Sequence, residues 1–324
     1  MLWVDGSDPS WLSVKNKYTD IQVDVSASIS RYRDWDNLQY WFRGVEKFAP
    51  WVNKIFFITW GHLPKWLNTS HPKLRIVNHK EFIPEKYLPT FNSNTIELNL
   101  HRIEELSEQF VLFNDDMFII NNVSESDFFS QGKPVDQFLL NAIAPSPQMP
   151  IIPHTIINNL RIINKYFNKK DVFKNNLGKI FNLKYGAKLG RTLLLSPWNR
   201  FTGFDNPHLP QSHLKSTFDL LWEKEYEDLD GTCVNKFRKY NDLNHWLMRY
   251  WNLCCGNFSP RSKGFGKYFN ITETNNAIKV YLTYQQGKTI CINDSSFIPN
   301  IETVKAEVNN SFDKILSEKS SFEV

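Results

Sequence analysis

The sequence predicts an α/β fold, a mostly parallel Rossmann-like sheet flanked by helices, with a basic helical insertion. Short apolar runs rich in β-branched and aromatic residues alternate, in the first half of the chain, with segments of helical periodicity. This alternation is typical of parallel sheets, because successive parallel strands need crossover connections. The 324 residues are 41% hydrophobic and 15% aromatic, which is enough to form a large buried core.

Four apolar runs are predicted as strands. The chain opens with "MLWVDGSDP", a short apolar run that ends at Asp, Gly and Pro, as a strand does where it meets a loop. Further buried strands are expected at 54–59, 74–77 and 110–113 from their β-branched and aromatic content. A helix is expected before the second strand, at 36–49, and another before the fourth, at 94–106.

The helix at 36–49 has a clear amphipathic pattern. We expect Asp36 to be its N-cap and the helix to stop before Pro50. Its apolar residues recur at helical spacing, so one face should pack against the sheet: Leu38, Trp41, Phe42, Val45 and Phe48.

Helices are also predicted in the second half, at 213–229 and 241–253. Two late apolar runs, "IKVYLTY" (278–284) and "TICIN" (289–293), are expected as strands that return to the sheet. After Pro299 the chain becomes polar and charged, which predicts a terminal helix or tail.

These elements divide the chain unevenly. We expect a single domain over 1–300, interrupted at about 122–200 by a mainly helical insertion, and a polar C-terminal helix or tail over 301–324.

Composition narrows the classes of function. The net charge of +4 is too small to indicate a nucleic-acid partner. The four cysteines show no CxxC spacing, so neither a zinc site nor a disulfide framework is indicated, and reduced thiols in a cytoplasmic protein are expected. No apolar stretch approaches the roughly 18 residues of a membrane span, and no signal-peptide pattern opens the chain.

The motif "FVLFNDDMFII" (110–120) places Asp115 and Asp116 directly after a predicted strand, where a parallel sheet presents its ligand-binding loops. Asp5 and Asp8 follow the first strand in the same way. An Asn-Asp-Asp sequence also suits an ordinary turn. The apolar residues on both sides favour a site, because buried carboxylates need a cation, and Mg²⁺ or Mn²⁺ with a phosphate ligand is the usual one.

Residues 155–195 carry nine Lys or Arg and one acid, Asp171. Apolar residues such as Ile156, Leu160 and Ile163 are interleaved with these charges, which is typical of a basic amphipathic helix that faces an anionic membrane or polymer. A solvated helical face is the alternative interpretation.

The sequence resembles the Stealth family of sugar-phosphate transferases, which includes bacterial capsular polysaccharide phosphotransferases and the α/β chain of the lysosomal-enzyme N-acetylglucosamine phosphotransferase. Its motifs cover about half of the chain, in family order, and include "WVDGSDPSW" (3–11), the run from "RYRDWDNLQYW" to "SEQFVLFNDDMF" (31–118), "HLPQSHLKSTFDLLWE" (208–223), "FRKYNDLNHWLMRYW" (237–251) and "CIND" (291–294). The family normally has more of the first strand before "WVDGSD". The resemblance implies a glycosyltransferase-like sheet and makes residues 1–300 a catalytic domain.

The resemblance implies that the protein moves a sugar 1-phosphate, usually N-acetylhexosamine 1-phosphate, from a UDP-sugar to a glycan hydroxyl, forming a phosphodiester and releasing UMP. Such a transfer needs a cation, an arginine and a base at the attacked phosphorus. By motif position the catalytic residues are Glu97, Asp116, His208 and Arg238. His208 would take the acceptor's proton, and the Arg238 fork would bind phosphate oxygens.

Other positions follow from the same motifs. The resemblance assigns the nucleotide-sugar pocket to Trp3, Asp5, Gly6 and Asn94, with assistance from Arg31, Arg33 and Asp34. Gly6 would let the backbone approach a ligand closely, since it has no Cβ. The metal, Mg²⁺ or Mn²⁺, is assigned to Asp115 and Asp116, with Asn293 and Asp294 of "CIND" as further candidates.

Simpler interpretations stand beside these roles. His208 follows Pro207 and could be a loop residue with an ordinary hydrogen bond. Glu97 lies four residues before His101 on the predicted helix, so the two could form an exposed i,i+4 pair.

The protein is therefore expected to act in capsular or cell-surface polysaccharide synthesis, in the cytoplasm, with peripheral contact at the inner membrane face through 155–195 where a lipid-linked acceptor lies. Two other functions remain open. A metal-dependent glycosyltransferase would attack the anomeric carbon and release UDP, and a polysaccharide-binding module would turn over no donor.

Overall fold

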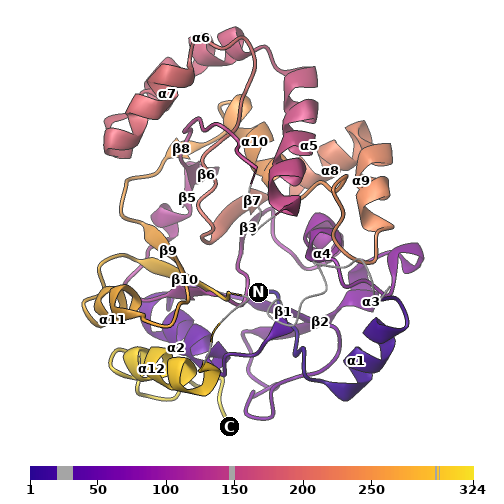
Figure 1. Ribbon diagram of the computed structural model, residues 1–324, viewed down its shortest axis with the longest axis vertical. Coiled ribbons are helices and arrows are strands. Elements are labelled where there is room, and N and C mark those ends of the chain that lie inside the picture. The colour runs from indigo at the N-terminus through magenta and orange to yellow at the C-terminus, as the bar shows by residue number, and fades with distance from the viewer. Residues whose placement is uncertain (20–31, 146–149, 296–297, 299) are drawn as a thin grey trace.

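Helices and short strands alternate along the chain in the computed structural model, which describes residues 1–19, 32–145, 150–295, 298 and 300–324 (Figure 1). The α/β class predicted from the sequence is therefore confirmed. The helices are α1 Pro9–Asn16, α2 Leu38–Phe48, α3 His79–Phe82, α4 Ser93–Leu98, α5 Ile151–Tyr166, α6 Lys169–Ile180, α7 Leu189–Leu195, α8 Lys215–Lys224, α9 Tyr226–Cys233, α10 Trp246–Cys254, α11 Asn276–Thr283 and α12 Ile301–Asp313.

The strands form several small sheets. They are β1 Ile55–Thr59, β2 Leu74–Asn78, β3 Gln109–Leu112, β4 Met117–Ile119, β5 Phe129–Ser130, β6 Lys133–Asp136, β7 Gln211–Leu214, β8 Ser259–Pro260, β9 Gly266–Asn270 and β10 Thr289–Asn293.

The prediction of a mostly parallel Rossmann-like sheet needs correction. In the described part of the chain the pairs β1–β2, β9–β10 and β6–β8 are parallel, whereas β3–β7, β4–β10 and β5–β6 are antiparallel. Strands β1 and β2 are parallel, as the predicted crossover pattern requires. Strands β7 and β10 come from later in the chain and run antiparallel to β3 and β4, respectively. Alternating periodicity in the sequence does not show which distant strands will pair.

The opening residues lie beside β1. Leu2 forms a parallel bridge with Ile58, and the Leu2 N–H donates to the Phe113 carbonyl at 3.0 Å. The run that was predicted as a strand therefore lies between β1 and the end of β3, and its loop begins next to the Asn-Asp-Asp motif.

The pairing of β7 with β3 brings two distant motifs together. Leu112, the last residue of β3, lies opposite Gln211, the first residue of β7. Because the strands are antiparallel, the residues that follow β3 meet the residues that precede β7. Asp116 and His208 are thereby placed at one edge of the sheet.

A second pairing adds the motif "CIND". Strand β10 is antiparallel to β4 with Cys291 opposite Met117, and the Ile292 N–H donates to the Asp116 carbonyl at 2.8 Å. The C-terminal end of β10 therefore adjoins the two carboxylates.

Helix α2 packs as its apolar pattern predicts, since all five predicted core residues are buried. Its predicted N-cap is wrong. The helix begins at Leu38 with Asn37 at the cap position, and Asp36 has a φ of +47°, outside the range of an N-cap. Asp36 instead forms an ion pair with Lys305.

The predicted strand at 278–284 is also wrong, because this segment lies in helix α11. Ile278, Tyr281 and Leu282 recur at helical spacing and are buried, whereas Val280 is exposed. Contacts along one face of the helix outweigh the strand preference of its β-branched residues. The strand predicted at 289–293 is confirmed as β10.

The segment from β4 to residue 200 begins with β5 and β6 and continues with α5, α6, the 3₁₀-helix η6 (Leu183–Lys188) and α7. Figure 1 places α6 and α7 at one end of the long axis, with α12 and the C-terminus toward the other. Arg249 of α10 fixes this segment to the rest, with its guanidinium bonded to both carboxylate oxygens of Asp136 at 2.7 and 3.0 Å.

The described core has two large parts and a small third one. The first surrounds α2, β4, β10 and α12, the second surrounds β2, α4, α5, α8 and α10, and the third groups Trp11, Phe91 and Phe237. Helix α12 contributes Val304, Val308 and Phe312 to the first part. Across the described residues, no helix has the length and apolar content that a membrane crossing requires.

Candidate active site

The carboxylate of Asp116 lies at the centre of the candidate site. Its Oδ2 is 3.2 Å from His208 Nε2 and accepts a hydrogen bond from Cys291 Sγ, also at 3.2 Å. Asp116 and His208 are partly buried, and Cys291 is fully buried. His208 lies in the loop before β7, as its simpler interpretation expects, and its partner is a carboxylate of the Asn-Asp-Asp motif.

Charge stabilises this contact. Burial raises the pKa of Asp116, but the charge and hydrogen bond of His208 outweigh that effect, so its pKa is below the ordinary value. Burial lowers the pKa of His208, and Asp116 more than compensates, so the pKa of His208 is raised. Each group therefore stabilises the charged form of the other.

Asp115 differs from its neighbour. Its side chain is exposed to solvent, yet the surrounding protein and the charge of Asp116 raise its pKa to about 7. A carboxyl with this pKa exchanges a proton near neutrality, and a cation bound beside it would favour its charged form.

Glu97 is 4% exposed, so the alternative of an exposed pair with His101 is wrong. The predicted helix is shorter than expected: α4 ends at Leu98, and His101 lies in the 3₁₀-helix η4 (Leu100–Arg102), stacked on Phe218. Burial raises the pKa of Glu97 to about 7, against the opposing charges of Arg238 and His208.

Arg238 reaches the same site from the segment between α9 and α10. It is partly buried, and its guanidinium donates a hydrogen bond to Ser93 Oγ at the start of α4. Ser93 also bonds to Glu97, and the charge of Asp116 acts on Glu97 as well. The four residues predicted as catalytic therefore come together from four separate segments.

Two buried residues that support this arrangement were missed in the sequence. Asp242 is fully buried and accepts hydrogen bonds from Asn92, Asn94 and Asn235 side chains at 2.8, 3.2 and 2.8 Å. It also accepts the Lys239 N–H at 3.0 Å. Asp242 thus joins the start of α4 to the segment that carries Arg238.

The second missed residue is His245. Its Nε2 lies 3.7 Å from Glu97 Oε2, and its Nδ1 lies 3.2 Å from His213 Nε2. Burial, followed by the nearby cationic groups, lowers the pKa of His245 well below its ordinary value, so the ring is neutral. Both Asp242 and His245 belong to "FRKYNDLNHW", so the motif was a signal, but the burial that gives them these roles is visible only in the fold.

The residues predicted for the nucleotide pocket lie in part beside the site. Trp3 is buried and stacks on Phe57 at a centroid distance of 5.6 Å. The Asp5 N–H donates to His62 Nε2 at 2.7 Å. A Cβ on Gly6 would lie 2.0 Å from the Tyr32 carbonyl oxygen, so the backbone that approaches Gly6 is that of Tyr32.

The other predicted pocket residues have defined partners. Arg33 forms an ion pair with Asp294 at 3.1 Å, and Asp34 accepts the Asp36 N–H at 2.9 Å. Asn94 is buried, and its amide donates to Asp242. Arg31 lies outside the described residues.

The donors at the site suit a hard cation. Asp116 Oδ1 and Asn114 Oδ1 are buried oxygens without hydrogen-bond partners among the described residues, and Asp115 lies between them in sequence. Carboxylate and amide oxygens are the ligands that Mg²⁺ prefers. Asp116, His208 and Cys291 also offer ligand atoms within 4.8 Å of one another, but burial and Asp116 raise the pKa of the Cys291 thiol well above its ordinary value, which favours the protonated form.

The two candidates from "CIND" lie at the end of β10. The Asp294 charge is balanced by Arg33, and its Oδ2 has no hydrogen-bond partner in the described structure. The Asn293 amide nitrogen donates to Asn270 Oδ1 at 3.0 Å, which leaves its oxygen as a potential ligand. The residues present thus fit a divalent cation, with Asp115 and Asp116 as the main charged ligands.

Comparisons with known proteins show the family of this chain. Residues 31–136 match the model of Stealth protein conserved region 2. That range contains Glu97 and both carboxylates of the motif. The protein belongs to the Stealth family, a membership that whole-chain relatives also support.

A capsular polysaccharide phosphotransferase, WcwK of Streptococcus pneumoniae, is 45% identical over 99% of this chain and 96% of its own. An exopolysaccharide phosphotransferase, cps2G of Lactiplantibacillus plantarum, is 39% identical over 100% and 95%. A receptor polysaccharide phosphotransferase, WefC of Streptococcus oralis, is 38% identical over 99% and 97%. The similarity therefore extends through every segment that contributes to the site.

Proposed function

We propose that the protein is a phosphotransferase of cell-surface polysaccharide synthesis that moves N-acetylhexosamine 1-phosphate from a UDP-sugar to a glycan hydroxyl and releases UMP. The names of the whole-chain relatives support the class of reaction. The observation that carries the proposal is the convergence of Glu97, Asp116, His208 and Arg238, which supplies acid–base groups and a phosphate ligand in one place.

His208 is the proposed base. Its Nε2 faces Asp116 Oδ2 at 3.2 Å, so Nδ1 is the nitrogen left to take the proton of the acceptor hydroxyl. When the ring becomes an imidazolium, the adjacent carboxylate stabilises it, as the raised pKa of His208 indicates.

Arg238 is the proposed phosphate ligand. Its guanidinium is permanently charged and planar, so two N–H groups can bind two phosphate oxygens at once. The charge of Arg238 acts on Glu97, and Ser93 bonds to both residues. Glu97, with a pKa near 7, can hold a proton on the donor's side of the site.

Asp115 and Asp116 would hold Mg²⁺ or Mn²⁺, with Asn114, Asn293 and Asp294 as neighbouring oxygen donors. Such an ion, when bound, neutralises charge on the pyrophosphate of the donor. Trp3, Asp5 and the segment around Arg33 would line the nucleotide side of the site.

We further propose that the acceptor is a lipid-linked glycan and that the protein works in the cytoplasm at the inner membrane face. A growing surface polysaccharide is anchored there during synthesis, and the basic segment 155–195 suits an anionic partner.

A donor screen tests this function. The purified protein is incubated with individual UDP-sugars and a glycan acceptor, with and without EDTA, and the released nucleotide is identified by chromatography. UMP release that EDTA abolishes and Mg²⁺ restores supports the proposal. UDP release would identify a glycosyltransferase instead, and the absence of turnover with every donor would favour a binding module.

A further inference from the structure

Large apolar side chains are exposed on the helical segment between residues 177 and 198. Leu183 is 89% exposed, Leu194 74% and Leu193 62%. We call these three residues, with Leu177 and Trp198, which are also more than half exposed, the exposed leucine surface. Side chains of this size are rarely left in water in a cluster unless another surface covers them.

The segment that carries this surface is fixed to the protein. Tyr185 and Thr192 are buried, and the Thr192 hydroxyl accepts the Leu140 N–H at 3.0 Å. Arg191 donates to Asn141 Oδ1 at 2.9 Å and pairs with Asp205 at 3.2 Å. The leucines therefore point outward from an anchored helix.

Lys169 joins the two helices of this region. It is buried, and its Nζ donates to the Leu195 and Trp198 carbonyls at 2.7 and 3.0 Å. The start of α6 is thus held against the end of α7, which places the lysines that follow Lys169 beside the exposed leucine surface. Lys169 itself is a structural residue and is not available to a partner.

Positive charge surrounds the apolar residues. Lys170, Lys174 and Arg200 are exposed, and within the described structure none of them forms an ion pair. Asp205 is already bonded to Lys188 and Arg191. Asp171 is the acid of the segment, so the balance is strongly basic.

We infer that the exposed leucine surface and its flanking lysines bind the anionic face of a lipid bilayer. Leucine and tryptophan insert at the level of the headgroups, while lysine and arginine bind lipid phosphates. An anionic polymer would match the charge but not the leucines, and a second copy of this basic surface would repel it. Of these three partners, the bilayer satisfies both features.

This inference rests on the proposed function only in its purpose, which is to bring the site to a lipid-linked acceptor. Binding to the bilayer itself requires no donor, metal or acceptor, so it can be measured separately.

The first test removes the apolar contacts. The wild type should cosediment with vesicles of phosphatidylcholine and phosphatidylglycerol. The variant Leu193→Ser/Leu194→Ser/Trp198→Ser should bind roughly tenfold more weakly or worse, since several apolar side chains no longer insert. The matched control Val280→Ser/Tyr284→Ser changes exposed residues of α11 and its end, and should bind like the wild type. Equal binding by all three proteins would overturn the inference.

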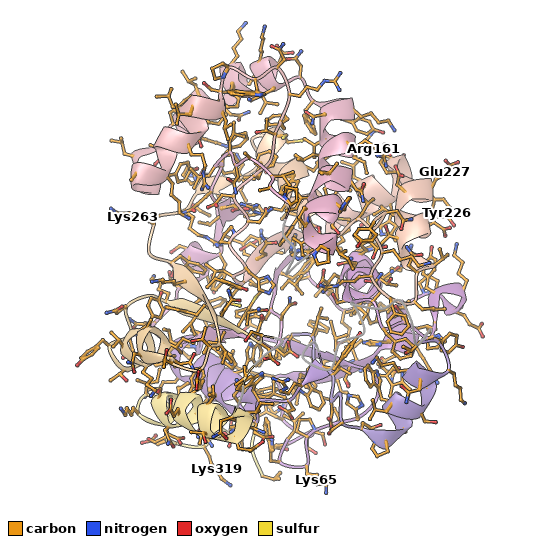
Figure 2. All side chains as sticks on the ribbon, in the orientation of Figure 1. Lys65, Arg161, Tyr226, Glu227, Lys263 and Lys319 are labelled. Atoms are coloured by element: carbon orange, nitrogen blue, oxygen red, sulfur yellow. The ribbon has the colours of Figure 1, made fainter. Side chains whose placement is uncertain are left out.

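The second test removes charge. Lys170→Glu/Lys174→Glu should weaken binding to phosphatidylglycerol vesicles and remove much of its salt dependence. The control Lys65→Glu/Lys80→Glu reverses two exposed lysines on other elements, and Figure 2 shows Lys65 at the end of the molecule away from α6 and α7. Identical losses in both variants would mean that no specific surface is involved.

Two further measurements separate the alternatives. If the triple variant changed the oligomeric state in light scattering while vesicle binding stayed intact, the leucines would be an interface between copies, and the inference would be wrong. Turnover of a soluble acceptor should be equal in wild type and triple variant. Vesicle binding without any nucleotide release would instead contradict the proposed function and leave the inference standing.

Discussion

Asp116 sets the ionisation of His208, and this gives a direct prediction for Asp116→Asn. The substitution should reduce turnover by roughly 10²–10⁴-fold, because the base loses the carboxylate that stabilises its charged form. The pKa of His208, followed by NMR, should fall below its wild-type value, since burial then acts without compensation. Asp219→Asn, an exposed carboxylate, is the control. An unchanged His208 titration in Asp116→Asn would contradict the assignment.

The same pair predicts how stability depends on pH. The pKa of His208 is raised by folding, so its contribution is complete below the unfolded value of about 6.5 and is lost as pH rises through the folded pKa. The pKa of Asp116 is lowered, so its contribution is complete above about 4 and is lost at lower pH.

Asp116 and His208 should therefore stabilise the protein most between about pH 4 and about pH 6.5. Urea denaturation of wild type and His208→Gln across this range checks the prediction. A stability difference that did not decrease above pH 6.5 would count against it.

Arg238→Lys tests whether a planar ligand is needed. Lysine keeps the charge but offers no paired N–H groups in a fixed plane, so kcat/KM should remain far below wild type, with a loss of about 10²-fold or more. Arg238→Ala should be at least as impaired, and steady-state kinetics with both variants make the comparison. Full activity in the lysine variant would show that charge alone suffices.

At the scale of elements, Asp242 holds the segment of Arg238 against α4. In Asp242→Asn an NH2 group replaces one of the two oxygens that accept from three amide groups and a backbone N–H, so it faces a donor and at least one of these bonds is lost. We expect a loss of stability of about 1–3 kcal/mol, measured by urea denaturation. Activity should fall as well, because Arg238 is no longer fixed relative to Glu97.

The matched control for this prediction is Asp228→Asn, a change in a more exposed ion pair with Arg161. Surface pairs contribute little, so it should change stability by less than about 1 kcal/mol. Equal losses of stability in the two variants would show that Asp242 does not hold the Arg238 segment against α4.

Helices and strands were predictable from the sequence where the residue pattern within one segment determines its structure. Helix α2 and strands β1, β2 and β3 follow from local periodicity, and the Asn-Asp-Asp motif follows from its place after a strand. The strand prediction at 278–284 fails because burial along one helix face outweighs the strand preference of the residues there. The contacts of Cys291 with Asp116, of Asp242 with Asn94 and of His245 with Glu97 join residues more than 90 positions apart, and a local pattern cannot supply them.

At the scale of the whole molecule, the C-terminal residues pack into the first part of the core, around α2. Phe322 is 2% exposed, with its ring 5.2 Å from Phe42 of α2. Arg43 bonds to both carboxylate oxygens of Glu323 at 2.8 and 2.7 Å. The polar composition of residues 301–324 does not indicate that Phe322 and Glu323 contact α2.

Phe322→Ala should therefore destabilise the protein by about 3–5 kcal/mol, as expected for a buried aromatic ring. Thermal unfolding measures the effect, and Tyr284→Ala, which removes an exposed ring, is the control. If Phe322→Ala unfolded at the wild-type temperature, the C-terminal residues would have no part in the core.

The pairing of β10 with β4 has a consequence for how the protein is made. Translation delivers the N-terminal part first, so a nascent chain carries Asp116 long before Cys291 and the C-terminal anchor leave the ribosome. Until then the strand edge that holds Asp116 lacks its neighbour. The candidate site is therefore complete only after the C-terminal part of the chain has been synthesised.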